Sequence, residues 1–349
     1  MTHTESEAEL HYGVKIDATF EKNTQPPSET QVASLLSLKG RTAIVTGAGA
    51  GIGFGVVEAF AEAGANVALW YNSNPEAIEK AKKISKTYGI TCKAYKVNIT
   101  DEEATIKTIN QVVQDLNGRL DIFVANAALY WNHGRLINSS TSDVQEIMNT
   151  NLMSIYYAAK AAGKYFQRQK ETGTDIYGSK LENFHSGSFI VTSSIASVNQ
   201  LRPQAATPYC VTKAAVTQFV KGLAVEFVKF ARVNLVCPGY VDTELLDPTP
   251  GGIRRCWSQM TPMGREGTVS EMKGAFLYLA SDAASYTTGA EIFVDGGVSI
   301  PSFGTLLGLL FLMEVYSTHA FNRVLSKYVL YCSYTTLLYY PCWQLVLVV

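Results

Sequence analysis

A tyrosine and a lysine four residues apart carry the clearest chemistry in this 349-residue chain. Tyr209 and Lys213 open an apolar run over 214–220 that is typical of a helix, and a spacing of four places both side chains on one helix face. An ammonium beside a phenol favours the phenolate, so we expect the pKa of Tyr209 to fall from roughly 10 toward the working pH. Such a tyrosine is usable as a general acid and base. The alternative is a solvated helix-surface pair without a chemical role.

A hydroxyl group is expected close to this pair. The run from Phe189 to Ser194 is typical of a buried strand that ends in two serines. In open α/β sheets, ligands bind at the carboxyl ends of the strands, so a hydroxyl at that end points into the binding crevice. Ser194 is the candidate, and capping of the strand is its structural alternative.

A glycine-rich turn supplies a second kind of site. Residues 46–53, Thr-Gly-Ala-Gly-Ala-Gly-Ile-Gly, follow the apolar run 43–45 and precede the helix-like segment 56–63. Glycines let the backbone turn tightly and approach phosphates, and the amino-terminal end of a helix attracts anions. The order of strand, turn and helix therefore predicts a site for a dinucleotide pyrophosphate, whereas the glycines alone would also suit a flexible loop.

The end of the second expected strand bears on which dinucleotide binds. NAD sites usually place a carboxylate there, which accepts a hydrogen bond from the ribose 2′-hydroxyl and repels a 2′-phosphate. Here residues 69–74 read Leu-Trp-Tyr-Asn-Ser-Asn, and no carboxylate follows before Glu76. We therefore predict NADP(H), because the repulsive element is missing. No lysine or arginine occurs within 42–79, so Asn72 and Ser73 would bind the phosphate with neutral donors.

Short apolar runs alternate with helix-length amphipathic stretches from residue 40 onward, without an internal repeat. Seven strands are expected, over residues 43–46, 66–71, 91–97, 122–125, 187–193, 233–237 and 291–295. This alternation predicts an α/β, doubly wound Rossmann fold, with a parallel seven-stranded sheet and helices on both faces. We expect one domain over 38–301 after a flexible arm over 1–37, and a surface insertion over 166–187.

Over about residues 38–301 the chain resembles the short-chain dehydrogenase/reductase family. The shared motifs occur in the family's order: the glycine turn, Asn126-Ala-Ala in place of Asn-Ala-Gly, the helix asparagine Asn151, the serine, tyrosine and lysine, and Pro238-Gly239. The resemblance implies a catalytic set of Ser194, Tyr209, Lys213 and Asn151. It also implies a cofactor-binding set, which consists of Thr46, Gly47, Gly51, Ile52, Gly53, Asn72, Ser73, Asn98, Asn126, Tyr209, Lys213, Pro238, Gly239, Val241 and Thr243. Because the gap between Ser194 and Tyr209 is slightly longer than in many members, Ser193 and Ala196 are alternatives for the serine.

In particular, the chain resembles the fungal sorbose and xylulose reductases and mannitol 2-dehydrogenases, at residues 37–40, 70–73, 94–99 and 203–204. The resemblance implies that Tyr209 protonates a carbonyl oxygen to which Ser194 donates a hydrogen bond. It implies that Lys213 lowers the tyrosine pKa and holds the ribose, and that Asn151 fixes a water in a proton relay. The expected reaction is NADP(H)-dependent reduction of a ketose or related polyhydroxy ketone to a polyol.

A substrate with many hydroxyls needs polar partners in the pocket. The candidates lie in five places: residues 199–200, Gln204, Tyr240, residues 131–133 and residues 244–263. Two other functions compete with ketose reduction. One is a reductase of an apolar ketone that the carboxyl tail brings to a membrane, and the other is a non-catalytic cofactor-binding protein.

Composition limits the partners. The formal net charge of −1 and the pI near 6.5 provide no basic field, so we expect no nucleic-acid partner. Six cysteines without a CxxC pair predict neither a metal site nor a disulfide framework, which fits reduced thiols in the cytoplasm. The polar amino terminus has the features of neither a secretory signal nor a transit peptide. The family resemblance implies a homotetramer built partly by the helices that begin near Val144 and Tyr209.

The carboxyl end departs from the pattern. Residues 302–349 form an apolar extension in which only Glu314, Arg323 and Lys327 are fully charged. Three interpretations remain open: a tail anchor, an extra helical pair packed on the body or a partner subunit, and sequence appended by an inaccurate gene model. Membrane association is expected only through this extension.

Overall fold

The computed structural model describes residues 23–244 and 249–300. Contacts between Cα atoms group the chain into residues 1–299 and 300–349, and the described helices and strands all belong to the first group. The three interpretations of the extension over 302–349 concern residues outside the described part, and residues 1–22 of the expected arm over 1–37 also lie outside it. Within the described remainder of that arm, residues 32–35 form a short helix. Within the described ranges, the helices are too short or too polar to cross a bilayer.

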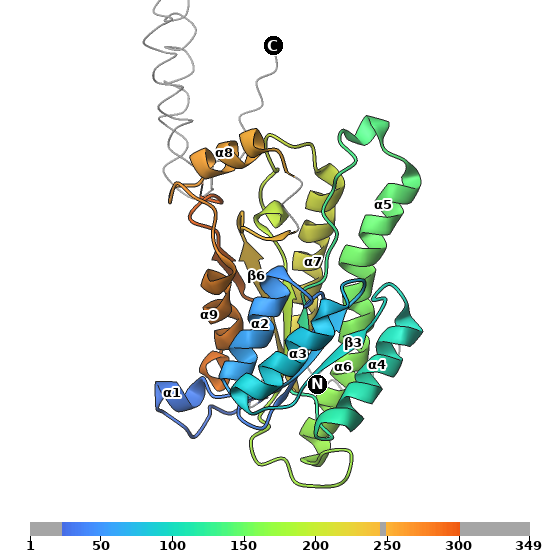
Figure 1. The fold of residues 1–349 in the computed structure, drawn as a ribbon. Coiled ribbons are helices and arrows are strands. Elements are labelled where there is room, and N and C mark those ends of the chain that lie inside the picture. The colour runs from blue at the N-terminus through green and yellow to red at the C-terminus, as the bar shows by residue number, and fades with distance from the viewer. Residues whose placement is uncertain (1–22, 245–248, 301–349) are drawn as a thin grey trace, which may run out of the picture. The chain divides into compact units, whose positions relative to one another are not determined.

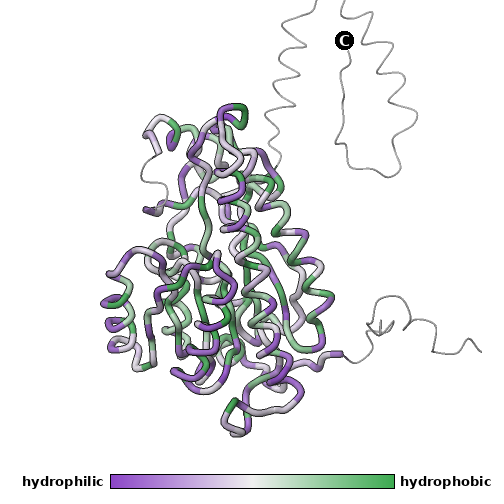
Figure 2. The backbone as a smooth tube through the Cα atoms, turned by 90° about the vertical axis from the view of Figure 1, so that its right-hand side faces the viewer, coloured by the Kyte–Doolittle hydropathy of each residue, from purple (hydrophilic) through white to green (hydrophobic). Residues whose placement is uncertain are grey.

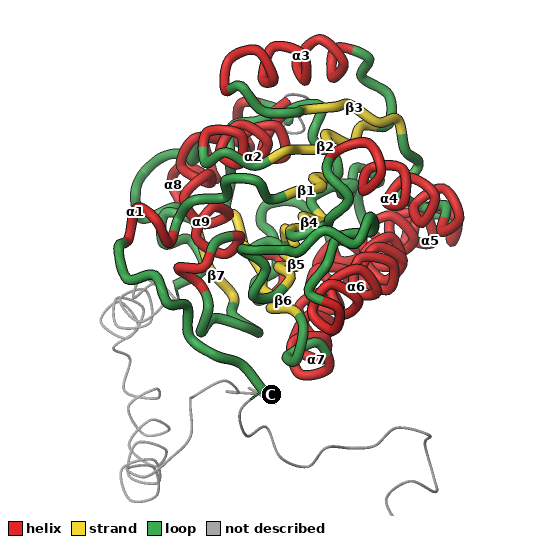
Figure 3. Tube along the Cα trace, turned by 90° about the horizontal axis from the view of Figure 1, so that it is seen from below, coloured by secondary structure: helices red, strands yellow, loops and turns green. Residues whose placement is uncertain are grey.

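The centre of the protein is a parallel sheet of seven strands in the order β3-β2-β1-β4-β5-β6-β7 (Figures 1 and 3). The strands are β1 (Thr42–Val45), β2 (Asn66–Tyr71), β3 (Cys92–Lys96), β4 (Ile122–Ala125), β5 (Gly187–Thr192), β6 (Ala231–Pro238) and β7 (Glu291–Val294). Strands β2 and β3 lie on one side of β1 and strands β4 to β7 on the other. This change of side creates a crevice between the carboxyl ends of β1 and β4. The predicted doubly wound Rossmann fold is confirmed.

Helices cover both faces of the sheet, as the view along the sheet in Figure 3 shows. One face carries α2 (Gly51–Glu62), α3 (Glu76–Tyr88) and α9 (Val269–Ala280), and the other carries α4 (Glu102–Leu116), α6 (Ser154–Thr172) and α7 (Thr207–Glu226). Three shorter helices are α1 (Val32–Leu35), α5 (Thr141–Met148) and α8 (Gly251–Met260). A π-helical turn, Asn149–Met153, joins α5 to α6. Each helix layer buries its own hydrophobic cluster against the sheet.

The strands are recognisable in the sequence because both faces of a covered parallel sheet are apolar. Every residue of β1, β4 and β5 is buried, and the polar side chains among them are only Thr42, Ser188 and Thr192. Figure 2 shows hydrophobic segments through the interior and hydrophilic ones along the outer turns and loops. The cost of exposing a large side chain, about 1.5–3 kcal/mol each, holds the strands in these positions.

The surface insertion is shorter than the sequence indicates. Its first seven residues, 166–172, belong to α6, and Gly173 ends the helix with a left-handed backbone, φ +66°. Residues 174 and 180 then form an isolated antiparallel bridge before β5 begins at Gly187. Helix length was underestimated because the polar residues after Phe166 lie on the outer side of a helix that is half-exposed.

Candidate active site

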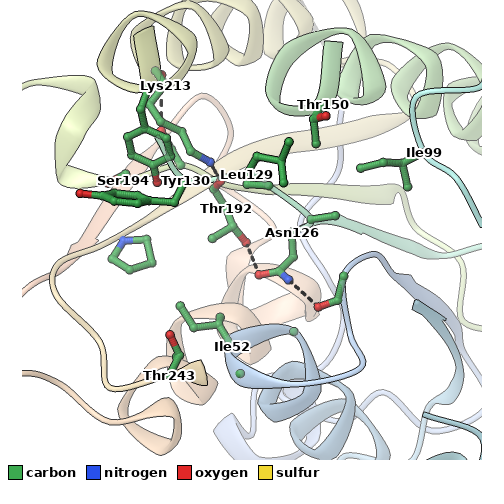
Figure 4. A pocket seen from close by; sticks show the side chains of 18 of the residues that line it. Ile52, Ile99, Asn126, Leu129, Tyr130, Thr150, Thr192, Ser194, Lys213 and Thr243 are labelled. Carbon is green, nitrogen blue, oxygen red and sulfur yellow. Dashed lines mark hydrogen bonds between the residues drawn. The ribbon is translucent and has the colours of Figure 1, made fainter. Parts of the chain in front are cut away.

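A cavity of about 1060 Å³ lies at the carboxyl ends of the central strands. Figure 4 shows residues that line it, from the glycine turn on one side to α7 on the other. The predicted site residues that line it are Gly47, Gly51, Ile52, Gly53, Asn72, Asn98, Asn126, Ser194, Tyr209, Lys213, Pro238, Gly239, Val241 and Thr243. Thr46, Ser73 and Asn151 are not among its lining residues. One crevice therefore brings together most residues that the sequence places far apart.

The glycine turn has the shape that a phosphate cradle requires. Gly47 and Gly51 have positive φ angles of +61° and +55°, which side chains disfavour. At Gly53, an added Cβ would lie 2.5 Å from both Gly47 O and the Asn126 amide nitrogen. Helix α2 begins at Gly51, so its unpaired backbone N–H groups lie beside the cavity. This donor set, with the positive end of the helix dipole, fits an anionic pyrophosphate.

Thr46 and Asn126 tie three strand ends together. The Thr46 hydroxyl oxygen accepts hydrogen bonds from the backbone N–H of Asn126 at 2.9 Å and of Ala127 at 3.0 Å. The Asn126 side chain donates to Thr46 O at 3.0 Å and accepts from the Thr192 hydroxyl at 3.1 Å. Thr46 therefore fixes the turn from behind rather than lining the cavity.

Helix α7 carries the predicted acid and its lysine. The Lys213 side chain is 2% exposed, and its ammonium donates to Thr192 O at 2.9 Å, a bond drawn in Figure 4. The same nitrogen lies 5.6 Å from the centre of the Tyr209 ring. Tyr209 is partly buried and borders the cavity, next to Tyr130 at 5.3 Å between ring centres. The spacing of four residues thus brings both side chains to one wall, as expected.

The direction of the tyrosine pKa is opposite to our expectation. Burial raises the pKa of Tyr209 above its usual value, and a hydrogen bond with Ser194 opposes this shift. Burial also lowers the pKa of Lys213 to about 8. Burial is the largest influence on the pKa of Tyr209, and the Lys213 ammonium is engaged with Thr192 O. The protein therefore holds Tyr209 as a protonated, neutral acid.

Ser194 is the better placed of the two serines. Both serines line the cavity, but Ser194 forms a side-chain hydrogen bond with Tyr209, and its hydroxyl oxygen accepts from the backbone N–H of Ala196 at 3.1 Å. The Ser193 hydroxyl faces α7 instead, 3.5 Å from Lys213 O and 3.4 Å from the Thr217 hydroxyl. Ala196, the other alternative, has no side-chain donor. The geometry therefore favours Ser194 as the hydroxyl that acts beside Tyr209.

Asn151 lies in the π-helical turn and is fully buried. Its amide nitrogen donates to Leu129 O at 2.9 Å and to the Thr212 hydroxyl at 3.2 Å, and its oxygen accepts from the Leu129 N–H at 2.7 Å. Both side-chain N–H donors are therefore engaged. Instead of reaching into the cavity, this side chain connects the strand-end loop to α7.

An aromatic wall borders the other side of the cavity. Tyr240 stacks on Trp257, with 4.5 Å between ring centres and 9° between planes, and the Trp257 N–H donates to the Gln204 side-chain oxygen at 3.2 Å. Among the expected substrate contacts, Tyr240, Glu244 and Trp257 line the cavity, and Gln204 stands behind Trp257.

Other expected contacts lie away from the cavity. Residues 199–200 and 131–133 do not line it, and residues 245–248 are outside the described part. His133 instead lies 3.5 Å from a carboxylate oxygen of Asp143, and the Trp131 N–H donates to Gly134 O. These side chains stabilise their own loop.

Sequence reasoning missed Tyr130, Thr192 and Lys80. Tyr130 lines the cavity, and its buried hydroxyl has no hydrogen-bond partner among residues 23–244 and 249–300. Lys80 donates from its ammonium to Gly49 O at 2.8 Å, which brings a cation to the glycine turn. The one feature of the sequence that could have indicated Tyr130 is its position four residues after Asn126, in the loop that follows β4.

No group of three or more acidic, histidine or cysteine side chains that could hold a metal occurs in the described ranges. The described cysteines, Cys92, Cys210, Cys237 and Cys256, are free thiols. Burial raises the pKa of both Cys92 and Cys237 to about 12, which keeps these two thiols protonated.

Comparisons with known proteins agree with this architecture. A family model described as enoyl-(acyl carrier protein) reductase matches residues 47–299. The chain is 52% identical over 279 residues to an L-xylulose reductase of Hypocrea jecorina, covering 80% of this chain and 97% of that protein. It is 44% identical over 278 residues to a sorbose reductase of Candida albicans, covering 79% and 93%.

Among solved structures, it is similar to an NADPH-dependent 3-quinuclidinone reductase from Rhodotorula rubra, with a TM-score of 0.74, 35% identity, and coverage of 81% of this chain and 100% of that one. The range matched by the family model covers β2 to β7 and all residues that line the cavity. The chain belongs to the short-chain dehydrogenase/reductase family of oxidoreductases.

Proposed function

We propose that this protein is an NADP(H)-dependent reductase that converts the carbonyl of a ketose or related polyhydroxy ketone to an alcohol. The observation that carries the proposal is the placement of Tyr209, Ser194 and the buried Lys213 together at the cavity, with the lysine nitrogen 5.6 Å from the centre of the tyrosine ring. A neutral phenol is the form that gives a proton to a carbonyl oxygen.

The cofactor would lie along the cavity from the glycine turn to α7. Backbone N–H groups of residues 47–53 would hold its pyrophosphate, and residues 238–243 would border its nicotinamide end. When bound, the reduced nicotinamide supplies a hydride to the carbonyl carbon. The cradle at Gly53, which has no room for a side chain, supports this arrangement.

Three side chains would handle the charge that develops on the carbonyl oxygen. Tyr209 donates its proton to that oxygen, and Ser194 donates a hydrogen bond to it. Lys213 stabilises the phenolate that remains, because a buried cation acts strongly at short range. Asn151 acts as a positioning residue that fixes the start of α7 through Thr212.

The preference for NADP(H) is supported by the end of β2. Asn72 borders the cavity and is exposed, no carboxylate lies between it and Glu76, and Ser73 lies on the same turn. The similar 3-quinuclidinone reductase is named NADPH-dependent. A 2′-phosphate would therefore meet neutral donors rather than a repelling charge.

The substrate class is supported by the relatives and by side chains that border the cavity. The two sequence relatives are named for xylulose and sorbose, both polyhydroxy ketones. Tyr130 lines the cavity, its buried hydroxyl lacks a partner among the described residues, and a group of this kind binds a substrate hydroxyl well. The stacked rings of Tyr240 and Trp257 provide an apolar surface for the carbon chain.

We also propose that the protein forms a homo-oligomer, with a homotetramer as the expected state. Tyr156 on α6 is 42% exposed, and Val211 and Val225 on α7 are 52% and 59% exposed. Apolar residues on neighbouring helices favour burial against another copy. Light scattering coupled to size-exclusion chromatography should give four times the chain mass, and a monomer would contradict this proposal.

One substrate panel separates the competing functions. Purified protein is assayed by NADPH oxidation with L-xylulose, L-sorbose and fructose beside apolar ketones of similar size. We expect the highest kcat/KM with a ketose. A consistent preference for the apolar ketones would favour the membrane-associated alternative, and NADPH binding without turnover on any ketone would favour the non-catalytic one.

A further inference from the structure

Lys80, which is not itself a lining residue, brings a positive charge to the glycine turn beside the end of β2, where the cofactor's adenosine ribose is expected. Its ammonium donates to Gly49 O at 2.8 Å, although 31 residues separate the two along the chain. Helix α3 makes this contact possible, because it runs back over the carboxyl end of β2 and buries Ala77 and Ala81 on its inner face. The sequence shows no lysine or arginine within 42–79, whereas the fold brings the Lys80 ammonium into contact with the glycine turn.

The surroundings of Gly49 connect this ammonium to the end of β2. A Cβ added at Gly49 would lie 3.6 Å from Tyr71 Cβ and 3.8 Å from Asn74 Cβ. Tyr71 and Asn72 both line the cavity. In dinucleotide sites of this architecture, the side chain at the end of the second strand meets the ribose 2′ position. Lys80 therefore lies next to the place where a 2′-phosphate differs from a 2′-hydroxyl.

The ammonium still has capacity to bind an anion. A lysine has three N–H donors, and the bond to Gly49 O uses one. The nitrogen lies 5.3 Å from the centre of the Phe54 ring, which holds it without neutralising it. The described ion pair of Lys80 is long, 3.9 Å to Glu76, and the Glu76 side chain is 72% exposed. Solvent screens such a pair strongly, so the carboxylate competes weakly with a phosphate.

We infer that Lys80 is the residue that selects NADP(H) over NAD(H), by pairing with the ribose 2′-phosphate beside Asn72. This inference rests on the proposed function, because it concerns the cofactor proposed for the same cavity. A phosphate dianion near an ammonium and a neutral amide gains a charge-assisted hydrogen bond that a 2′-hydroxyl cannot match. The bond to Gly49 O keeps the ammonium in place before the cofactor arrives, which reduces the entropy lost on binding.

The test compares binding of NADPH and NADH to the full chain without substrate, by fluorescence titration. The variant Lys80→Gln should raise the Kd of NADPH about 5- to 20-fold and that of NADH less than twofold. Lys80→Arg should largely restore NADPH affinity. Raising the salt concentration should weaken NADPH binding more in the unaltered protein than in Lys80→Gln.

Two matched variants sharpen the result. Lys82→Gln removes a cation from the same helix that pairs with Glu79 instead, and it should change neither Kd. Lys96→Gln removes the competing cation beside Tyr71 in the sheet register. The inference is overturned if Lys96→Gln rather than Lys80→Gln changes the ratio of the two Kd values.

A bracing role for Lys80 would also overturn the inference, and it would appear as an equal rise in both Kd values. The cofactor preference of the unaltered protein distinguishes a failure of the Lys80 role from a failure of the proposed cofactor. If it prefers NADPH and Lys80→Gln keeps that preference, only the role of Lys80 fails. If it binds NADH as tightly as NADPH, the proposed cofactor fails together with this role.

Discussion

The two ends of the cavity are built differently. At the carbonyl end, Ser194 and Lys213 are 8% and 2% exposed, and each forms a hydrogen bond with backbone atoms. At the adenosine end, Asn72 and Ser73 are exposed and make no side-chain hydrogen bond to other described residues. Burial fixes the reacting groups in one geometry, whereas the exposed end leaves its donors free for a ligand.

This difference predicts how each end responds to substitution. A group fixed by burial and hydrogen bonds has no substitute nearby, so its loss should remove chemistry. A group in an exposed turn acts through screened charge and adaptable contacts, so its loss should change selectivity by a smaller factor. Substitutions at both ends therefore test the comparison directly.

Apart from Tyr209 itself, the largest effect is expected at Lys213. Lys213→Met removes the buried cation that stabilises the phenolate of Tyr209, and we expect kcat to fall by about 10²- to 10⁴-fold. Steady-state NADPH oxidation with a ketose measures this. A loss below fivefold would place the lysine outside the reaction.

The same variant gives a pH test that needs no substrate. Burial lowers the pKa of Lys213 to about 8, while the unfolded lysine titrates near 10.4. Between these values the unfolded chain binds more protons than the folded one, so this residue makes stability rise with pH. Below about pH 8 both states are protonated, and the contribution is flat.

Urea denaturation of the protein and of Lys213→Met at pH 7.5 and 9.5 measures this effect. The unfolding free energy of the unaltered protein minus that of the variant should increase as the pH rises. Titrating groups that do not interact with Lys213 occur in both chains and cancel in the difference, and burial raises the pKa of the Cys237 thiol to about 12, so this neighbour of Lys213 stays protonated at both pH values. A difference that stays constant or moves the other way would show that Lys213 keeps an ordinary pKa.

A smaller effect is expected at the adenosine end. Asn72→Asp places a carboxylate where a 2′-phosphate would lie, and we expect NADPH affinity to fall about 10- to 100-fold while NADH affinity rises or stays equal. Titration with both cofactors measures the ratio. Asn110→Asp on α4 makes the same charge change away from the cavity and should leave the ratio unaltered. If the ratio of the two affinities is unaltered in Asn72→Asp, the ribose 2′ position of the cofactor does not lie at the end of β2.

The smallest effect is expected at Tyr130, which packs against Tyr209. Tyr130→Phe removes a buried hydroxyl without a partner in the described structure, so stability should stay equal or rise slightly. We expect kcat/KM to fall about 3- to 10-fold for a ketose and to change little for an apolar ketone. Tyr165→Phe, whose hydroxyl donates to Asn110, is the matched control. Equal losses on both ketones would assign Tyr130 a packing role.

The sequence predicted the parts of this molecule that follow from local pattern. The buried strand β4 is an unbroken apolar run, and the four-residue spacing of Tyr209 and Lys213 places both on one helix face because α7 is a regular helix. The glycine turn was equally recognisable, since strand, turn and helix are adjacent along the chain.

Features that depend on packing between distant segments could not be predicted in this way. Lys80 reaches Gly49 only because α3 folds back over β2. The pKa of Tyr209 moves upward because burial outweighs the lysine, whose ammonium is bonded to Thr192 O. The engaged side chain of Asn151 is likewise a consequence of where the loop after β4 meets α7.

The most direct test of the account is Tyr209→Phe, measured for NADPH affinity and for turnover of a ketose. The phenyl ring keeps the packing against Tyr130 and removes only the hydroxyl that would donate the proton. We predict NADPH affinity within about twofold of the unaltered protein and a loss of turnover of at least about 10³-fold. Turnover close to that of the unaltered protein would contradict the assignment of Tyr209 as the acid.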